Sequence, residues 1–243
     1  MRSVAEVAGV PARQPRMGDF LATNRGGGLY SEAVSQRLGA VIALAGNRLG
    51  LAPSVLTLLN LGLGLAASVA VVVLAPRAAA GSVPAWAVGL LALVAWQIAY
   101  AFDCADGQLA RVTGRTSSAG ARLDILCDVA AQIGLVAALS AMAVAYRPGT
   151  PAWLVAVFAG TWMVNLITSV MQFGPNPASL MPSRSLPVRA IKLVRDYGAV
   201  ILLAGLVLTF APQWTIAVMW AFTVVNGLFL LASIAFSARS SLR

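Results

Sequence analysis

Residues 53–76 read PSVLTLLNLGLGLAASVAVVVLAP and carry no charged side chain. The chain has other long uncharged stretches, between Arg77 and Asp103, between Asp128 and Arg147, between Arg147 and Arg184, and between Asp196 and Arg239. A helix needs roughly 20 apolar residues to cross the hydrocarbon core of a bilayer. Each stretch is long enough for at least one crossing, and the last is long enough for most of two.

The composition of the whole chain agrees with a membrane location. Hydrophobic residues make up 59% of the 243 residues and charged residues only 10%, whereas a soluble domain usually has about 25% charged residues. So few charges could not cover a surface that faces water. We therefore expect an all-α integral membrane protein with six transmembrane helices, at about 53–76, 84–108, 119–146, 151–173, 190–210 and 213–237.

The N-terminal residues have a different character. Residues 1–28 contain Pro11, Pro15 and a run of three glycines, and we expect a disordered cytoplasmic segment there. Residues 29–49 mix charged and apolar side chains, which predicts an amphipathic helix lying in the cytoplasmic interface. The membrane domain is then expected to cover residues 29–238, and residues 239–243 are expected to form a cytoplasmic tail.

The net charge of +9 follows the expected topology. With both termini in the cytoplasm, all of the 17 basic residues except Arg77 and Arg147 fall on the inner side. This distribution is the positive-inside pattern of multi-pass membrane proteins. The basic excess therefore indicates orientation and attraction to anionic lipid head groups, and it does not indicate nucleic-acid binding.

The acidic residues are few and clustered. After Glu32 the chain has only Asp103, Asp106, Asp124, Asp128 and Asp196. The first four lie at the predicted cytoplasmic ends of the second and third spans. Asp103 and Asp106 are three residues apart, and Asp124 and Asp128 are four apart, so each pair shares one helical face. Because the two spans are antiparallel neighbours, the two faces can meet and form a pocket of carboxylate oxygens.

From the residues alone, such a pocket could bind a metal ion, line a transport path or pair with arginine. Adjacent carboxylates repel one another and take up protons unless a cation neutralises them, and hard ions such as Mg²⁺ or Mn²⁺ prefer oxygen ligands. Zinc bound with Cys104 and Cys127 is a weaker alternative, because the chain has no histidine. Carboxylates within a membrane also line ion or proton paths, or pair with arginine.

The residues around the aspartates resemble a known family. Residues 103–128 read DCADGQLARVTGRTSSAGARLDILCD, which is similar to the signature D-x2-D-G-x2-A-R-x8-G-x3-D-x3-D of CDP-alcohol phosphatidyltransferases. All fixed positions of the signature are filled, by Asp103, Asp106, Gly107, Ala110, Arg111, Gly120, Asp124 and Asp128. The sequence LGLAPSVLTLLN at 49–60 resembles the entry of the family's first span, with Ser54 where asparagine is common.

The resemblance implies an enzyme of phospholipid biosynthesis. Its donor would be a CDP-alcohol, with CDP-diacylglycerol expected, and the phosphatidyl group would pass to the hydroxyl of a second alcohol with release of CMP. The reverse arrangement, in which a soluble CDP-alcohol donates to diacylglycerol, has the same motif. Two ions of Mg²⁺ or Mn²⁺ are implied as cofactors. A homodimer in the cell membrane, with its active site facing the cytoplasm, is also expected.

The resemblance also implies the roles of individual residues. Asp103, Asp106, Asp124 and Asp128 would be metal ligands, and Asp128 would also act as the general base. The CDP-alcohol would contact Gly107, Ala110, Arg111, Ser117, Thr57 and Ser54. Among these, Arg111 would bind phosphate, and Gly107 would leave room for close approach of the nucleotide.

The acceptor site is expected near the basic residues that precede the fifth span. Arg184, Arg189, Lys192 and Arg195 would suit a phosphorylated acceptor such as inositol phosphate or glycerol 3-phosphate, and their alternative explanation is topology. Asp196 would pair with Arg195 or contact a lid. The rival function from another class is a membrane transporter of metal ions or protons that uses the aspartate cluster as its ion site.

Overall fold

The protein is described here by a computed structural model of residues 14–24, 28–172 and 196–241. Within these ranges every regular element is helical and no strand occurs. The expected all-α class is therefore confirmed for the described part of the chain. The predicted acceptor residues Arg184, Arg189, Lys192 and Arg195 lie outside the described residues.

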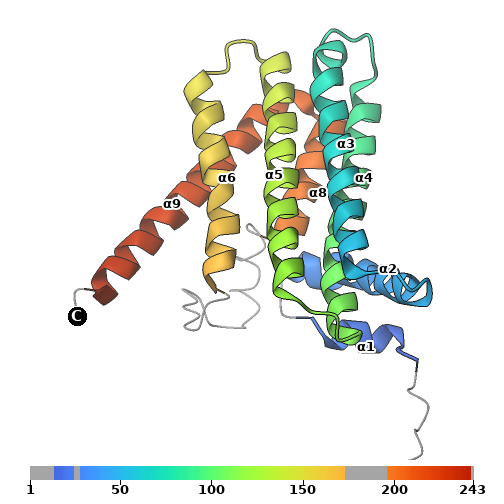
Figure 1. Cartoon of the computed structure of the whole chain (residues 1–243). Coiled ribbons are helices and arrows are strands. Elements are labelled where there is room, and N and C mark those ends of the chain that lie inside the picture. The colour runs from blue at the N-terminus through green and yellow to red at the C-terminus, as the bar shows by residue number, and fades with distance from the viewer. Residues whose placement is uncertain (1–13, 25–27, 173–195, 242–243) are drawn as a thin grey trace, which may run out of the picture.

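The long helices form a bundle (Figure 1). Helix α3 (Pro53–Ala79) packs along both α4 (Ala85–Val112) and α5 (Ser118–Tyr146), and α8 (Tyr197–Phe210) packs on α4. The short 3-10 turn η3 (Pro212–Trp214) leads from α8 into α9 (Thr215–Ser241). Helix α9 packs on α6 (Ala152–Gln172) and runs obliquely away from the other helices.

Four helical segments in the described residues are long and apolar enough to cross a membrane. They are Pro53–Ala79, Ala85–Val112, Ser118–Tyr146 and Pro212–Arg239. These match the predicted first, second, third and sixth spans. The predicted fourth and fifth spans contain the shorter apolar helices Ala152–Val164 and Tyr197–Phe210, so a total of six crossings stays a prediction.

The two ends of the bundle differ in what they carry. The connections from α3 to α4 and from α5 to α6 lie at one end, whereas the short N-terminal helices and the C-terminus lie at the other (Figure 1). Arg77 is in the last turn of α3 and Arg147 follows the end of α5, so both belong to the first end. This placement agrees with the predicted orientation, which itself stays a prediction.

The N-terminal segment contains a helix, so the expected disorder of residues 1–28 is wrong for part of that range. Helix α1 (Met17–Ala22) buries Phe20 completely. Phe20 lies in a cluster of buried apolar residues that comprises Ala40, Ala43, Leu56, Ala105 and Leu109. Burial of one large aromatic side chain anchors the short helix, which has too few residues to be stable alone.

Most of the range 29–49, for which an interfacial amphipathic helix is predicted, is helical, with an irregular turn near its start. It begins with a π-helical turn η1 (Ser31–Ser35) and continues as α2 (Gln36–Arg48). A Cβ atom on Gly39 would come within 2.8 Å of Cys104 Cβ and 3.1 Å of the Ala101 carbonyl oxygen, so the glycine permits close packing of α2 on α4. The location of α2 in a membrane interface stays a prediction.

At the C-terminus, α9 continues to Ser241, past the expected end of the membrane domain at residue 238.

Asp196 joins the N-terminal segment to the start of α8. Its side chain caps α8 by accepting a hydrogen bond from Gly198 N at 3.1 Å. It also accepts bonds from Tyr30 N at 2.9 Å and Ser31 N at 3.0 Å, and from the Ser31 hydroxyl. Asp196 is 4% exposed. Among the described residues, Asp196 is therefore a buried carboxylate that binds a segment 165 residues away. Its expected pairing with Arg195 lies outside the described residues.

Neighbouring polar side chains extend this contact to α4. The Tyr30 hydroxyl donates to Gln97 Oε1 at 3.0 Å, and Gln97 Nε2 donates to the Gly198 carbonyl oxygen at 3.1 Å. The hydroxyls of Ser31 and Tyr100 are 2.9 Å apart. Burial, and secondly the charge of Asp196, raises the pKa of Tyr30, which keeps its phenol in the donating form. The network fixes α4, α8 and the N-terminal segment to one another.

We predict that Asp196→Ala strongly destabilises the protein. The substitution leaves buried backbone N–H groups without an acceptor, and each such group costs about 1–3 kcal/mol. The expected loss in free energy of unfolding is about 3 kcal/mol or more, measured by denaturation in detergent. Asp19→Ala is the control, because Asp19 is exposed and accepts one bond, from Arg16 N. Equal stability of the Asp196→Ala variant and the wild type would contradict the structural role of Asp196.

Candidate active site

The turn between α4 and α5 brings the two aspartate pairs together. Helix α4 ends at Val112, and Gly114 follows with a φ of 69°, in the left-handed region that glycine adopts without strain. Arg115 N then donates to the Ala110 carbonyl oxygen at 2.9 Å and closes the helix end. Ser117 starts α5 by accepting a bond from Gly120 N at 3.0 Å. The glycine turn that ends α4 and the serine cap that starts α5 are close in sequence, so the chain reverses and α5 runs antiparallel to α4.

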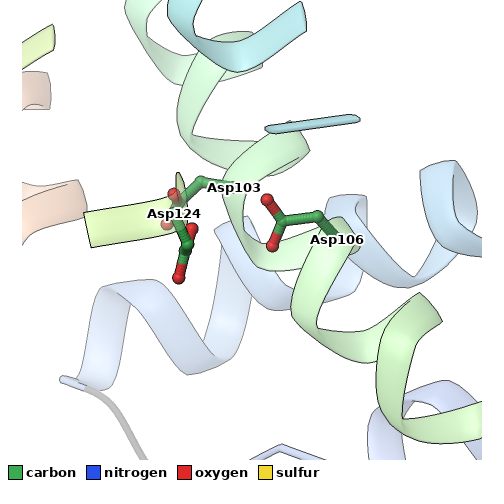
Figure 2. A group of neighbouring side chains, drawn as sticks. All are labelled: Asp103, Asp106 and Asp124. Carbon is green, nitrogen blue, oxygen red and sulfur yellow. The ribbon is translucent and has the colours of Figure 1, made fainter. Parts of the chain in front are cut away.

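Three of the predicted metal ligands form one group of carboxylates. Asp103 and Asp106 project from α4 and Asp124 projects from α5, as Figure 2 shows. One carboxylate oxygen of each residue lies within 4.8 Å of the others. Asp106 is buried, with 6% of its surface exposed, and Asp103 and Asp124 are half-buried.

The fourth predicted ligand, Asp128, lies beside this group. It is one turn beyond Asp124 on α5, is half-buried, and interacts electrostatically with the Asp103 carboxylate. The two predicted pairs, one on α4 and the other on α5, thus face the same site, although it is α3 that packs along both helices. In the described residues the structure brings all four predicted aspartates to one place.

Helix α3 adds two polar side chains that face the aspartates. Thr57 Oγ1 donates to Asp106 Oδ2 at 2.5 Å. Asn60, one turn further along α3, donates from Nδ2 to Asp103 Oδ1 at 3.1 Å. Asn60 is not among the site residues predicted from the sequence. The signal that could have found it is a polar amide three residues after Thr57 on the same helical face of an apolar span.

Arg111 and Gly107 lie next to each other at the edge of the group. A Cβ atom on Gly107 would come within 2.9 Å of Arg111 Nη1 and 3.1 Å of Nη2. The guanidinium therefore lies across the bare backbone of Gly107. Arg111 also interacts electrostatically with Asp124. This arrangement places a planar cation with several N–H donors beside the carboxylates.

The remaining predicted donor-binding residues surround the same end of α3, α4 and α5. Ala110 is half-buried on α4, Ser54 is half-buried in the first turn of α3, and Ser117 is exposed at the start of α5. Ser117 Oγ accepts the capping bond from Gly120, so its own hydroxyl hydrogen can be donated elsewhere. Contact of any of these residues with a nucleotide stays a prediction.

The chemistry of the carboxylate group fits a divalent cation. Several carboxylate oxygens from two helices supply the all-oxygen ligand set that hard ions prefer. Among the described residues, the group of side chains that fits a metal contains aspartates and neither cysteine. Cys104 and Cys127 are free thiols. The zinc alternative therefore finds no support in the described residues.

The comparisons with known proteins agree with the site. No curated protein sequence matches the chain. The family model described as CDP-alcohol phosphatidyltransferase matches residues 50–229, a range that runs from the residues just before α3 into α9 and includes all four aspartates of the site. A match over this much of the sequence, together with an aspartate group built from the family's signature residues, shows that the chain belongs to the CDP-alcohol phosphatidyltransferase family.

Proposed function

We propose that the protein transfers a phosphatidyl group from a CDP-alcohol, with CDP-diacylglycerol as the expected donor, to the hydroxyl of a second alcohol. The family implies a transferase that acts on a CDP-alcohol and an alcohol acceptor. The observation that carries the proposal is the meeting of Asp103, Asp106 and Asp124 within 4.8 Å at the end of an apolar bundle. Nothing in the family assignment or in the described residues favours the rival transporter.

The reaction is a displacement at phosphorus. The acceptor hydroxyl forms a new bond to the phosphorus that carries the lipid alcohol, the bond from that phosphorus to the CMP oxygen breaks, and CMP leaves. Asp128 takes the proton of the acceptor hydroxyl, because a carboxylate at the attacking group is suited to general-base catalysis. Asp128 lies one turn beyond Asp124 on α5, beside the group formed by Asp103, Asp106 and Asp124.

The four aspartates would hold two divalent ions, Mg²⁺ or Mn²⁺. When bound, such ions neutralise charge on the phosphate oxygens in phosphoryl transfer. Arg111 contributes a guanidinium that pairs with a phosphate of the CDP group. Gly107 and Ala110 present little side chain, which leaves space at the helix surface once the Arg111 guanidinium turns toward a phosphate.

The nucleotide and acceptor contacts complete the proposal. Ser54 and Ser117 lie around the aspartate end of the bundle as hydroxyl contacts for the nucleotide, whereas the Thr57 hydroxyl in the same region donates to Asp106. Arg184, Arg189, Lys192 and Arg195 would bind a phosphorylated acceptor such as inositol phosphate or glycerol 3-phosphate. We further propose a homodimer of the cell membrane, active in phospholipid biosynthesis, with the site and both termini facing the cytoplasm.

We predict that Asp124→Asn weakens the stabilisation of the protein by Mn²⁺. Saturation at about 100 times the dissociation constant stabilises a protein by about 2.7 kcal/mol, and a tenfold loss of affinity reduces this to about 1.4 kcal/mol at the same concentration. Thermal unfolding with and without Mn²⁺ measures the difference. Asp19→Asn, an exposed carboxylate on α1, should keep the full effect. An unchanged Mn²⁺ effect in Asp124→Asn would remove Asp124 from the metal site.

A separate expectation concerns Asp128→Asn. Loss of the base should lower the rate of transfer by about a hundredfold or more, whereas metal-supported binding of the CDP-lipid should largely persist. Single-turnover release of CMP and equilibrium binding of the donor distinguish the two effects. Full turnover by Asp128→Asn would rule out Asp128 as the base.

The whole proposal is tested by incubating purified protein with CDP-diacylglycerol, Mn²⁺ or Mg²⁺ and a panel of acceptors. The panel contains inositol phosphate, glycerol 3-phosphate and serine, and a parallel reaction supplies a soluble CDP-alcohol with diacylglycerol. We expect CMP release that requires both a metal and one acceptor, and that chelation abolishes. No CMP in any reaction, from protein that is folded, would contradict the proposed transfer.

A further inference from the structure

Helix α3 contributes no carboxylate to the site, yet it contacts two of the aspartates. Thr57 and Asn60 are three residues apart and project from one face of the helix. They are 4% and 5% exposed. Each donates to a different aspartate, Thr57 to Asp106 and Asn60 to Asp103. The two bonds join α3 to α4 at the predicted metal ligands.

The direction of the Thr57 bond limits what its hydroxyl can do. A threonine hydroxyl has one hydrogen. The Asp106 oxygen lies at 2.5 Å, whereas the alternative acceptor, the Pro53 carbonyl oxygen, lies at 3.4 Å. The hydrogen is therefore committed to Asp106 and is not available to a phosphate or base oxygen. This favours a role toward the carboxylate over the nucleotide contact expected from the sequence.

The bonds also constrain the carboxylates themselves. A carboxylate that accepts a bond at one oxygen loses rotational freedom, and its second oxygen then keeps a fixed direction. Thr57 engages Oδ2 of Asp106 and Asn60 engages Oδ1 of Asp103, so each bond holds one oxygen of a different predicted ligand. Side chains that hold metal ligands in this way typically change metal affinity about 10–100-fold when they are removed.

We propose that Thr57 and Asn60 are positioning residues of the metal centre: α3 orients Asp103 and Asp106 for the divalent ion. The inference rests on the proposed function, in which these aspartates bind metal. It assigns a role to Asn60, which is no part of the aspartate signature, and it moves Thr57 from the nucleotide to the carboxylates.

The test measures Mn²⁺ binding to purified protein without nucleotide, by electron paramagnetic resonance of the free ion. Thr57→Val keeps the shape of the side chain and removes the donor, and it should weaken Mn²⁺ binding about 10-fold or more. Thr57→Ser keeps the hydroxyl and should restore affinity to within about twofold of the wild type. Valine and serine both differ little in size from threonine. The Thr57→Val and Thr57→Ser variants therefore test the proposal even if an Asn60 variant fails to fold.

Asn60→Leu should weaken Mn²⁺ binding in the same way, by about 10-fold or more. Its matched control is Asn226→Leu, since Asn226 is a fully buried amide on α9 that donates to the Phe222 carbonyl oxygen of its own helix, at 3.0 Å. The control should bind Mn²⁺ like the wild type. A general effect of removing a buried amide would lower affinity in both variants and would overturn the role of Asn60.

The outcomes separate this inference from the proposed function. If Asp124→Asn loses Mn²⁺ binding but Thr57→Val and Asn60→Leu bind like the wild type, the aspartate site stands and the positioning role is overturned. If Asp124→Asn also binds Mn²⁺ like the wild type, the proposed metal site itself fails. If Asp124→Asn, Thr57→Val and Asn60→Leu all bind Mn²⁺ more weakly, both the metal site and the positioning role are supported. The controls Thr57→Ser and Asn226→Leu should then bind Mn²⁺ like the wild type.

Discussion

Mutual repulsion among carboxylates is the interaction on which the rest of the structure depends. Asp103, Asp106 and Asp124 bring oxygens within 4.8 Å of one another, with Asp128 in contact with Asp103, in a chain that is otherwise short of acidic residues. Charges in membrane helices are costly, and such residues usually mark a functional site. A cation that binds them converts repulsion into attraction, and this gives the end of the bundle its proposed chemistry.

Helix α4 is held in place on several sides, which gives the aspartates a fixed position. Gly39 allows α2 to pack closely on it, and Asn60 bonds to it from α3. Gln97 joins it to the start of α8, where Asp196 also binds the N-terminal segment. A site built on helices that are fixed in this way keeps its ligands close to the productive geometry. The buried networks thus link the fold to the proposed activity.

The aspartate site was predictable from the sequence because its information is local. Spacings of three and four residues place Asp103 with Asp106 and Asp124 with Asp128, and a short turn that contains Gly114 reverses the chain between the two helices. The expected direct packing of these helices is wrong, because α3 packs along both of them. Four of the expected spans were equally clear as long apolar runs. Helix α1 was missed because its Pro- and Gly-rich surroundings favour disorder, whereas Phe20 is anchored by residues far along the chain.

The contacts that the sequence did not reveal are all between distant residues. Asp196 binds Tyr30 and Ser31 across more than 160 residues, and no local pattern identifies that partner. In the sequence Asn60 is an isolated polar residue in an apolar span, and only the packing of α4 on α3 shows that it bonds to Asp103. Such roles depend on how helices pack, and hydropathy and spacing within one helix do not contain that information.

The most direct measurement of the central claim is anomalous diffraction from crystals of the protein grown with Mn²⁺ and a CDP-alcohol. Anomalous peaks are predicted between α4 and α5, ligated by Asp103, Asp106, Asp124 and Asp128, with the pyrophosphate of the CDP group against them. Saturating Mn²⁺ with no peak at these residues, or with the ions bound elsewhere on the chain, would contradict it.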